Sequence, residues 1–423
     1  MLLTHICTWT KIAAQLGYLR LRYWNRQSEF YSSALQLLRN ENILFTKIFQ
    51  SLAHSKNTRV SPELHAQLMH YTTNSSFTES EVDYETLSEI EELYSYTIDR
   101  NVINSGMIAL VFKGMDASGE PIIVKLKRKD IYPKLQRGCE AVKTFFSHAN
   151  WLRPQNTLLH LIKPFVTNID DILDQCDFAH EIENLRQAKD DFAELEFITI
   201  PTVYNRDEHI HNTPFIIMNF IDGTHTLPPN TVDSERLRYL DYFSRYMCYG
   251  FVHNTIQHTD LHSGNIIFRP TGLGIIDFGM AFQLTSEMND MISSVVMILV
   301  NQTPIHEIDF IDTFKELFVP NLDRTLISDS SVEAIEDLCI SITEPMFVGL
   351  EFDDIVISNN LAQLSELIGE PVVIHTDLYK ILLGLSMMGN NAAIMGQNYK
   401  HPDKIRDIER KALEDIIMNV MIS

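Results

Sequence analysis

Residues 258–265 (HTDLHSGN), followed twelve residues after Asn265 by Asp277-Phe278-Gly279, constrain this chain more than any other part of its sequence. Between them, residues 266–268 and 273–276 are short apolar runs separated by a Pro-Thr-Gly turn, a pattern that predicts a β-hairpin. Asp260 and Asn265 would lie on the loop that enters this hairpin, and Asp277 where its second strand ends. The sequence therefore predicts a site of two carboxylates and one amide.

Phosphoryl transfer requires groups of this kind, because the protein mainly positions the reactants and neutralises their charge. A carboxylate lies near the nucleophile, while an amide and a second carboxylate hold metal ions against the phosphates. Asn265 follows Asp260 by five residues, and Asp277 opens a D-F-G motif, as in the catalytic segments of protein kinases. We therefore expect ATP and Mg²⁺ as cofactors, with Asp260 as the catalytic carboxylate and with Asn265 and Asp277 as metal ligands.

Two other interpretations remain open. In the first, Asp260 caps a turn, His262 is packed and Asp277 forms an ion pair, and none of them has a chemical role. In the second, His253, His258 and His262 form a zinc cluster. The combined spacing favours the phosphoryl-transfer interpretation over both.

The length and charge of the chain limit its class. With 423 residues, 45% of them hydrophobic, it can bury a large core, and the length favours two or three structural units. The net charge of -22 argues against a nucleic-acid partner, since phosphate backbones are bound by clustered Lys and Arg. The five cysteines are never closer than 37 residues, which excludes a CxxC metal site and predicts a reducing intracellular compartment.

The first 28 residues are basic, with four cations and no acidic residue: Lys11, Arg20, Arg22 and Arg26. Such a segment could touch a lipid or an anionic membrane surface, although the sequence favours an ordinary first helix. We expect a protein that is soluble or peripheral to a membrane. A mitochondrial presequence is not favoured, because the segment has little Ser and its Arg residues cluster late. The apolar run at residues 381–395 is too short to span a bilayer.

Periodicity divides the chain into three parts. Residues 1–99 are predicted as a helical extension, 100–222 as a β-rich unit with a helical insertion, and 223–423 as a mainly helical unit. The predicted strands are 107–113, 122–127, 197–204 and 215–220. The predicted helices after residue 99 are 132–165, 170–196, 235–253, 286–300, 353–367, 379–395 and 404–421.

Lys125 lies within the apolar strand Ile-Val-Lys-Leu, one hairpin after the Ser105-Gly106 loop. The phosphate-binding Lys of kinases has the same position relative to its loop, although an exposed strand Lys is the plainer alternative. Asp177 and Glu181 are expected on one face of the 170–196 helix, where one acid could hold Lys125 and the other a second Lys or a metal. A solvated acidic face is the other interpretation. The Asp222-Gly223 turn after residues 215–220 suits a hinge where backbone groups bind adenine, with Met218 behind it.

Together, these motifs resemble the UbiB/ADCK/AarF family of atypical protein-kinase-like ATPases, over about residues 30 to 410. Residues 46–50 (TKIFQ) resemble its K-x-G-Q signature, residues 177–184 (DFAHEIEN) its E-x-D-F-x-x-E-A-x-N run, and residues 218–223 (MNFIDG) its hinge. The resemblance implies an α+β, protein-kinase-like bilobal fold. A small β-rich N-lobe and a mostly helical C-lobe would follow the helical extension.

The resemblance also implies roles for individual residues. Lys125 would bind the phosphates and pair with Glu181, and Lys47, Gln50 and Asp177 would form a regulatory segment that folds into the site. The nucleotide-binding candidates are Ser105, Gly106, Ala109, Lys125, Met218, Asn219, Ile221, Asn265 and Asp277. Members of the family resemble ATPases or small-molecule and lipid-linked kinases, and many are tied to ubiquinone or isoprenoid lipids; the sequence names no protein partner.

Three positions depart from the family pattern: Phe49 where the family has Gly, Gln175 where it has Glu, and residues 105–109 (SGMIA) in place of an Ala-rich loop. Phe49 would add bulk near the nucleotide, and Gly106 could let backbone amides approach phosphate. Two further hypotheses compete with this function. One is a small-molecule kinase of the aminoglycoside or choline type, and the other is a pseudokinase scaffold.

Overall fold

The computed structural model covers the whole chain and describes residues 2–54, 61–69, 77–152, 169, 171–228, 230–286 and 288–290, with residues 363, 366, 395, 408, 411, 412 and 415. Most of the predicted 286–300 helix lies outside these residues, as do nearly all of the predicted helices at 353–367, 379–395 and 404–421 and the apolar run at 381–395. The described residues form a mixed α+β structure.

The chain divides into two compact units. The first comprises Met1–His180 and Val203–Phe220, and the second comprises Glu181–Thr202 and Ile221–Ser423. The three-part division expected from the sequence stays a prediction.

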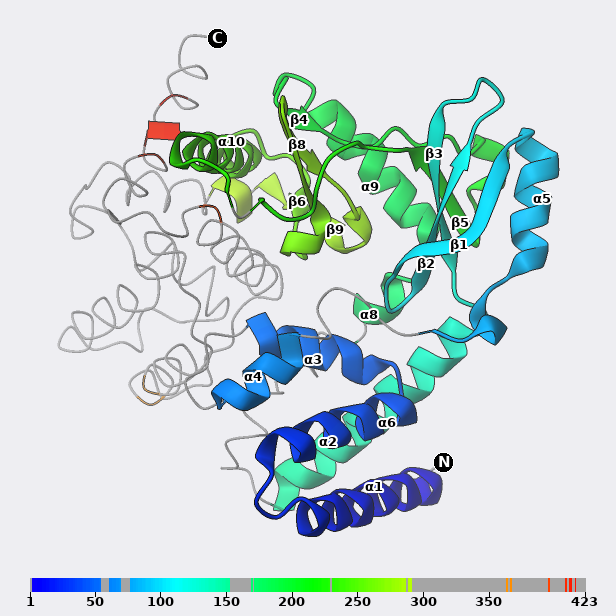
Figure 1. The fold of residues 1–423 in the computed structure, drawn as a ribbon, viewed down its shortest axis with the longest axis vertical. Coiled ribbons are helices and arrows are strands. Elements are labelled where there is room, and N and C mark those ends of the chain that lie inside the picture. The colour runs from blue at the N-terminus through cyan, green and yellow to red at the C-terminus, as the bar shows by residue number, and fades with distance from the viewer. Residues whose placement is uncertain are drawn as a thin grey trace, which may run out of the picture. The chain divides into compact units, whose positions relative to one another are not determined.

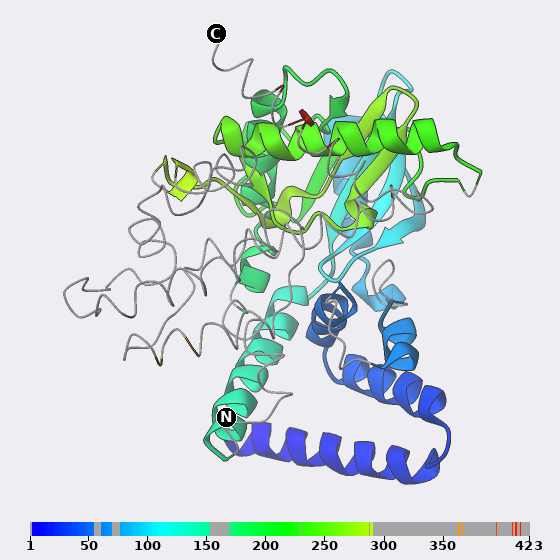
Figure 2. The ribbon, with the colours of Figure 1, turned by 90° about the vertical axis from the view of Figure 1, so that its left-hand side faces the viewer.

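Four helices open the first unit (Figure 1): α1 (Leu2–Arg22), α2 (Gln27–Glu41), α3 (Leu44–His54) and α4 (Pro62–Met69). We call them the N-terminal helices. Helix α4 packs against α2 and α3, and their small core is made of Leu35, Phe49 and Leu68. Helix α1 packs against α2 and against α6 (Ile131–Leu152) further along the chain (Figure 2).

Phe49 is therefore a core residue. It is 3% exposed, and its ring centroid lies 6.2 Å from that of Phe45. Lys47 precedes Phe49 by two residues, a rotation of about 200° around a helix, so the two side chains leave α3 on different faces. Phe49 stabilises the packing of the N-terminal helices, because its large side chain fills their core.

The first unit also contains an antiparallel four-stranded sheet of order β1-β2-β3-β5. Its strands are β1 (Thr97–Ser105), β2 (Ala109–Met115), β3 (Pro121–Lys127) and β5 (Phe215–Asn219). Burial alternates along β3, with Ile122, Val124 and Leu126 fully buried in a core that α5 (Tyr84–Tyr94) covers with Leu87 and Ile90. Lys125 thus belongs to the opposite face of the sheet, because successive side chains alternate across a strand.

The predicted hairpin of residues 107–113 and 122–127 is confirmed by β2 and β3, whose connecting turn is capped by Asp116. Strand β1 was not predicted. Its sequence, TIDRNVINS, is mostly exposed, and its register against β2 shifts twice. An edge strand of this kind carries no clean two-residue alternation, which is the signal that sequence reasoning uses.

Two predicted elements are shorter in the structure. The 170–196 helix is divided into α8 (Asp171–Asp174) and α9 (Phe178–Asp191), with Asp177 between them. The 197–204 strand is reduced to β4 (Ile198–Thr199).

The second unit holds a three-stranded sheet of order β4-β8-β7 and the paired strands β6 (Gln257–His258) and β9 (Ala281–Phe282). Strands β7 (Ile266–Arg269) and β8 (Gly272–Ile275) form the hairpin predicted after residue 265, and α10 (Asp233–Val252) confirms the predicted 235–253 helix. None of the described helices combines the length and the apolar character that crossing a bilayer requires.

We expect Phe49→Ala to lower the free energy of unfolding of the first unit by about 3–5 kcal/mol, because a large buried side chain leaves a cavity. Urea denaturation followed by tryptophan fluorescence measures the change. Leu21→Ala, at a site 70% exposed on α1, is the control and should change it by less than about 0.5 kcal/mol. Equal stability of the two variants would show that Phe49 is not a core residue.

Candidate functional site

The loop of residues 258–265 is fixed at its start by His258. The His258 ring is buried, its Nε2 lies 3.1 Å from the Ile276 carbonyl oxygen, and its Nδ1 accepts the Asp260 amide at 3.3 Å. Both contacts are satisfied by one neutral tautomer that carries its proton on Nε2. His258 therefore links the backbone of Asp260 to the residue that precedes Asp277.

Asn265 joins the loop to the hairpin. Its side-chain Nδ2 donates to the Asp260 carbonyl oxygen at 2.9 Å, and its own carbonyl oxygen accepts the Ile276 amide at 3.0 Å. The side chain is buried, and with its nitrogen engaged the amide oxygen Oδ1 is the atom suited to a metal ion. A carboxamide oxygen is a hard ligand of the kind that Mg²⁺ prefers.

Asp277 lies where β8 ends and the chain turns. It has φ +63°, and its Oδ1 accepts the Gly279 amide at 3.5 Å. Asp tolerates this left-handed conformation better than most residues, because its short polar side chain can bond locally. Asp277 directly follows Ile276, whose amide bonds to Asn265, and Asn265 in turn bonds to Asp260.

Glu181, in the first turn of α9, is only 2% exposed. A Cβ atom added at Gly279 would lie 3.3 Å from Glu181 Oε2 and 3.4 Å from Asp277 Oδ1. The two carboxylates therefore border the same glycine. The structure thus brings together four of the predicted site residues within the second unit: Glu181, Asp260, Asn265 and Asp277.

Asn184 is a site residue to which sequence reasoning gave no role. Its Nδ2 donates to the Phe278 carbonyl oxygen at 2.9 Å and to that of Ala281 at 3.0 Å. Thr259 Oγ1, on the 258–265 loop, donates to the Met280 carbonyl oxygen. The D-F-G segment is thus held both by α9 and by the 258–265 loop. The sequence signal was the position of Asn184 as the last residue of the 177–184 run that resembles a family motif.

The predicted lysine lies in the first unit. Lys125 pairs in register with Val111 and Ile216, and its Nζ lies 5.7 Å from the centroid of the Phe178 ring. Lys127 lies on the same face of β3, 4.9 Å from that centroid. Two ammonium groups therefore share one aromatic ring, a favourable placement for cations.

Lys127 is half-buried, as Lys125 is. Burial lowers its pKa, while Cys176 and Asp177 act in the other direction. Its Nζ donates to the Thr213 carbonyl oxygen at 3.3 Å. Burial also raises the pKa of the Cys176 thiol to about 11, so this cysteine stays protonated at neutral pH and is not an activated nucleophile.

The loop and hinge candidates also have defined places. Ser105 ends β1, and the Gly106 amide donates to the Ala109 carbonyl oxygen at 2.9 Å, which closes a tight turn. Met218 and Asn219 end β5 opposite Ile123 and Ile122. Ile221 is the first residue of the second unit after β5, and its Cγ2 would lie 2.9 Å from a Cβ added at Gly274.

The remaining predictions concern Lys47, Gln50 and Asp177. Lys47 is half-buried on α3; Gln50 lies on the same helix, but its side chain is outside the described residues. Asp177 is not on a helix face shared with Glu181, because it precedes α9 and its Oδ1 accepts the Ala179 amide at 3.0 Å. It is a helix-start residue, a position for which Asp is well suited.

The pairing of Lys125 with Glu181 would join the two units and stays a prediction, as does the approach of Lys47 to the site. The three histidines of the zinc hypothesis have different partners: His253 stacks on Tyr249, His258 bonds to Ile276, and His262 accepts the Gly264 amide. Across the described ranges, no group of three or more His, Cys, Asp or Glu side chains is arranged to hold a metal ion.

Comparisons of this chain with known proteins show its family. The family model described as "ABC1 atypical kinase-like domain" matches residues 67–304, more than half of the chain. A chloroplastic protein of Arabidopsis thaliana, "Protein ACTIVITY OF BC1 COMPLEX KINASE 1", is 21% identical over 227 residues, which are 52% of this chain and 33% of that protein. An ABC1 family protein of Schizosaccharomyces pombe is 24% identical over 209 residues, 45% of this chain and 37% of that protein.

Two further matches carry no activity in their names. An uncharacterised protein from the hydrogenase 1 5' region of Clostridium pasteurianum is 26% identical over 234 residues, 52% of this chain and 42% of that protein. Among solved structures, a Mycobacterium tuberculosis protein in complex with erythromycin is similar at a TM-score of 0.45 and 15% identity, with 76% of this chain and 85% of that chain covered. The chain thus spans less than half the length of these curated relatives.

A loop, hairpin and D-F-G of this order define a kinase-like domain. The chain belongs to the ABC1 atypical kinase-like family, which confirms the resemblance to UbiB/ADCK/AarF proteins.

We expect Asn184→Leu, which keeps the side-chain size but removes both hydrogen bonds, to destabilise the second unit by about 1–3 kcal/mol, because two carbonyl oxygens lose their donor. Thermal unfolding measures this. Gln187→Leu is the control, since Gln187 lies exposed on the same helix, and it should cost less than about 0.5 kcal/mol. If the two variants unfold alike, Asn184 does not anchor the D-F-G segment.

Proposed function

We propose that this chain is an atypical kinase or ATPase that binds ATP with Mg²⁺ and transfers the γ-phosphoryl group to an acceptor. The observation that carries the proposal is the arrangement of Asp260, Asn265 and Asp277. Asn265 bonds to the Asp260 backbone by its side chain and to Ile276, the neighbour of Asp277, by its own backbone, so hydrogen bonds connect the backbone at all three positions. Phosphoryl transfer depends on such positioning more than on covalent chemistry by the protein.

The donor set fits magnesium. Asn265 Oδ1 and the Asp277 carboxylate are hard oxygen ligands, and Mg²⁺ is usually bound by one or two protein groups together with phosphates and water. When bound, Mg²⁺ would neutralise phosphate charge. Asp260 would orient the acceptor hydroxyl or water and accept its proton as the oxygen bonds to phosphorus, while ADP leaves with the bridging oxygen.

The first unit would bind the rest of the nucleotide. Lys125 would neutralise phosphate charge, the turn after Ser105 would supply backbone amides, and the chain from Met218 to Ile221 would contact adenine. This assignment includes a protein-kinase-like bilobal arrangement, with Glu181 as the partner of Lys125 and with the Lys47 segment limiting access to Asp260. The acceptor would be water, a small molecule or an isoprenoid lipid such as a ubiquinone precursor.

We expect Asp277→Asn to abolish the thermal stabilisation of the protein by Mg-ATP, because the substitution removes the only negative charge among the two proposed protein ligands of Mg²⁺. Asp260→Asn should keep that stabilisation but reduce ATP turnover by a factor of about 10²–10⁴, the usual contribution of a general base. Differential scanning fluorimetry and an ADP-release assay measure the two effects.

The control is Asp233→Asn, an exposed acid at the start of α10, which should change neither quantity. Wild-type stabilisation of Asp277→Asn by Mg-ATP would contradict the metal assignment. Mg-ATP binding by the wild type without turnover would favour the pseudokinase scaffold, and efficient transfer to an aminoglycoside or choline would favour a small-molecule kinase.

We also propose that the N-terminal end of the first unit binds an anionic membrane surface. Tyr18, Leu21 and Trp24 are 61%, 70% and 66% exposed, and Arg20 and Arg22 lie between them in sequence. Apolar and basic side chains that alternate near one helix end suit the interface of a bilayer with acidic lipids.

Sedimentation with phospholipid vesicles tests this proposal. The protein should bind vesicles that contain acidic lipid several-fold better than neutral ones, and Leu21→Ser/Trp24→Ser should lose most of that binding, because less apolar surface is buried. Ile103→Ser, which changes an apolar side chain 50% exposed on β1, is the control. Equal binding by the double variant and the wild type would rule out this surface.

A further inference from the structure

A buried arginine lies behind the turn between β1 and β2. Arg128 is 2% exposed and is among the largest fully buried side chains of the described residues. Burial of a guanidinium is costly unless acceptors and a counter-ion surround it. Its contacts therefore indicate what this charge does in the fold.

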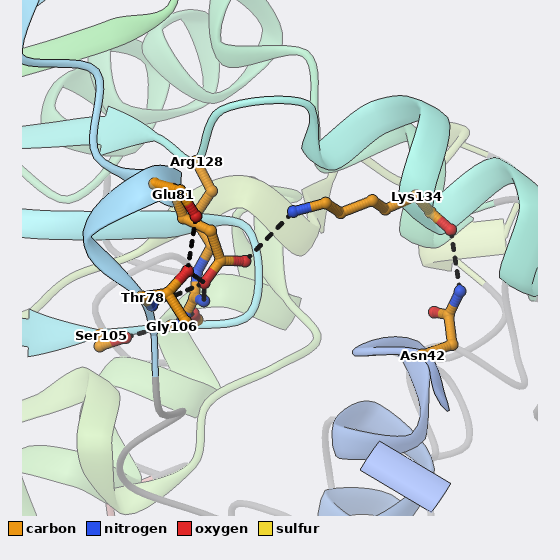
Figure 3. A network of polar contacts seen from close by, with 8 residues as sticks. Asn42, Thr78, Glu81, Ser105, Gly106, Arg128 and Lys134 are labelled. Atoms are coloured by element: carbon orange, nitrogen blue, oxygen red, sulfur yellow. Dashed lines mark hydrogen bonds and ion pairs between the residues drawn. The ribbon is translucent and has the colours of Figure 1, made fainter. Parts of the chain in front are cut away.

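Arg128 holds the turn at three points (Figure 3). Its Nη2 donates to Ser105 Oγ at 2.7 Å and to the Gly106 carbonyl oxygen at 2.6 Å. Its backbone amide donates to the Ile108 carbonyl oxygen at 2.8 Å. Charge-assisted hydrogen bonds this short are stronger than neutral ones, so Arg128 determines where the carbonyl groups of the turn lie.

The amides of the turn are used differently. Gly106 donates to the Ala109 carbonyl oxygen, whereas the amides of Met107 and Ile108 donate to no backbone carbonyl within the described part of the chain. Successive backbone amides in a turn are a common binding site for phosphate oxygens. Arg128 thus bonds to the carbonyl oxygens of Gly106 and Ile108, while the amides of Met107 and Ile108 are the two donors that could bind an anion.

Glu81 holds the guanidinium in place. Its Oε2 lies 3.4 Å from Arg128 Nη1, and its Oε1 lies 3.4 Å from Lys134 Nζ on α6. Burial acts to raise the pKa of Glu81, but the Thr78 amide and the charges of Arg128 and Lys134 lower it below its ordinary value. Glu81 therefore stays ionised at neutral pH as the counter-ion of Arg128.

The contacts continue to the N-terminal helices. Asn42 Nδ2 donates to the Lys134 carbonyl oxygen at 3.0 Å, and Asn42 Oδ1 accepts the amide of Leu44, the first residue of α3, at 2.9 Å. Figure 3 shows Asn42, Lys134 and Glu81 as successive members of this set. Polar contacts through Arg128, Glu81, Lys134 and Asn42 therefore connect the turn to α3, the helix that carries Lys47.

We propose that Arg128 is a positioning residue for the nucleotide: it keeps the β1–β2 turn in the conformation that accepts phosphate, without touching the nucleotide itself. This inference rests on the proposed function, in which that turn binds phosphate. Lys125 lies three residues before Arg128, so one strand supplies the phosphate-binding cation and leads into the residue that shapes the turn. Loss of Arg128 loosens the turn and weakens nucleotide binding, while Asp260 in the second unit keeps its environment.

The test compares Arg128→Met with the wild type in two measurements. Hydrogen exchange of the Gly106 amide, which bonds to the Ala109 carbonyl oxygen across the turn, should become about tenfold faster without nucleotide, because the loss of two charge-assisted bonds loosens the turn. The KM for Mg-ATP should rise about tenfold, with kcat changed by less than about twofold. Arg128→Lys should give intermediate values, because it keeps the charge but has one nitrogen in place of the two that contact the turn and Glu81.

The matched control is Arg100→Met, which removes an ion pair of β1 with Glu91 at 2.5 Å and should leave both measurements unchanged. A folded Arg128→Met protein with wild-type exchange and KM overturns the inference. If Arg128→Met does not fold, Ser105→Ala decides, since it removes one acceptor only. Faster exchange of the Gly106 amide supports the role, and wild-type exchange of that amide overturns it. A wild type that does not bind Mg-ATP would refute the proposed function instead, and the exchange measurement would still decide the role of Arg128.

Discussion

The geometry of the candidate site depends on the hydrogen bonds by which Asn265 connects the 258–265 loop to the end of the following hairpin. One side-chain bond to Asp260 and one backbone bond from Ile276 fix the distance between the loop and the D-F-G motif. His258 adds a second link to Ile276, and Asn184 holds the chain beyond Phe278. Because phosphoryl transfer relies on positioned charges, this small hydrogen-bond network is what gives the site its geometry.

The two units contribute different kinds of group. The second unit contains the carboxylates and the amide, whereas the first contains the lysines, the turn that Arg128 holds and the N-terminal helices. Phe49 stands where the family pattern has Gly, and local packing explains this departure. Its side chain packs with Leu35 and Leu68 in the core of those helices. The N-terminal helices therefore have their own packing requirement, to which the K-x-G-Q-like segment is adapted.

Much of the fold could be predicted from the sequence, because β2, β3, the β7–β8 hairpin and α10 carry strong periodic patterns. Strand β1 could not, since an exposed edge strand with a shifted register has no alternation. The sequence predicts Asp177 on a helix, because periodicity does not show that the helix begins one residue later, at Phe178. Arg128 lies between Lys127 and Lys129, and such a basic run normally indicates a solvated surface; only the three-dimensional contacts with Ser105, Gly106 and Glu81 reveal that it is buried.

The most direct measurement is a crystal structure with Mn²⁺ and a non-hydrolysable ATP analogue, in which the anomalous signal of manganese locates the metal. A manganese ion about 2 Å from both Asn265 Oδ1 and the Asp277 carboxylate, and in contact with the phosphates, is the predicted result. A nucleotide bound elsewhere, or a metal ion that contacts neither residue, would contradict the assignment of this loop and D-F-G motif as a phosphoryl-transfer site.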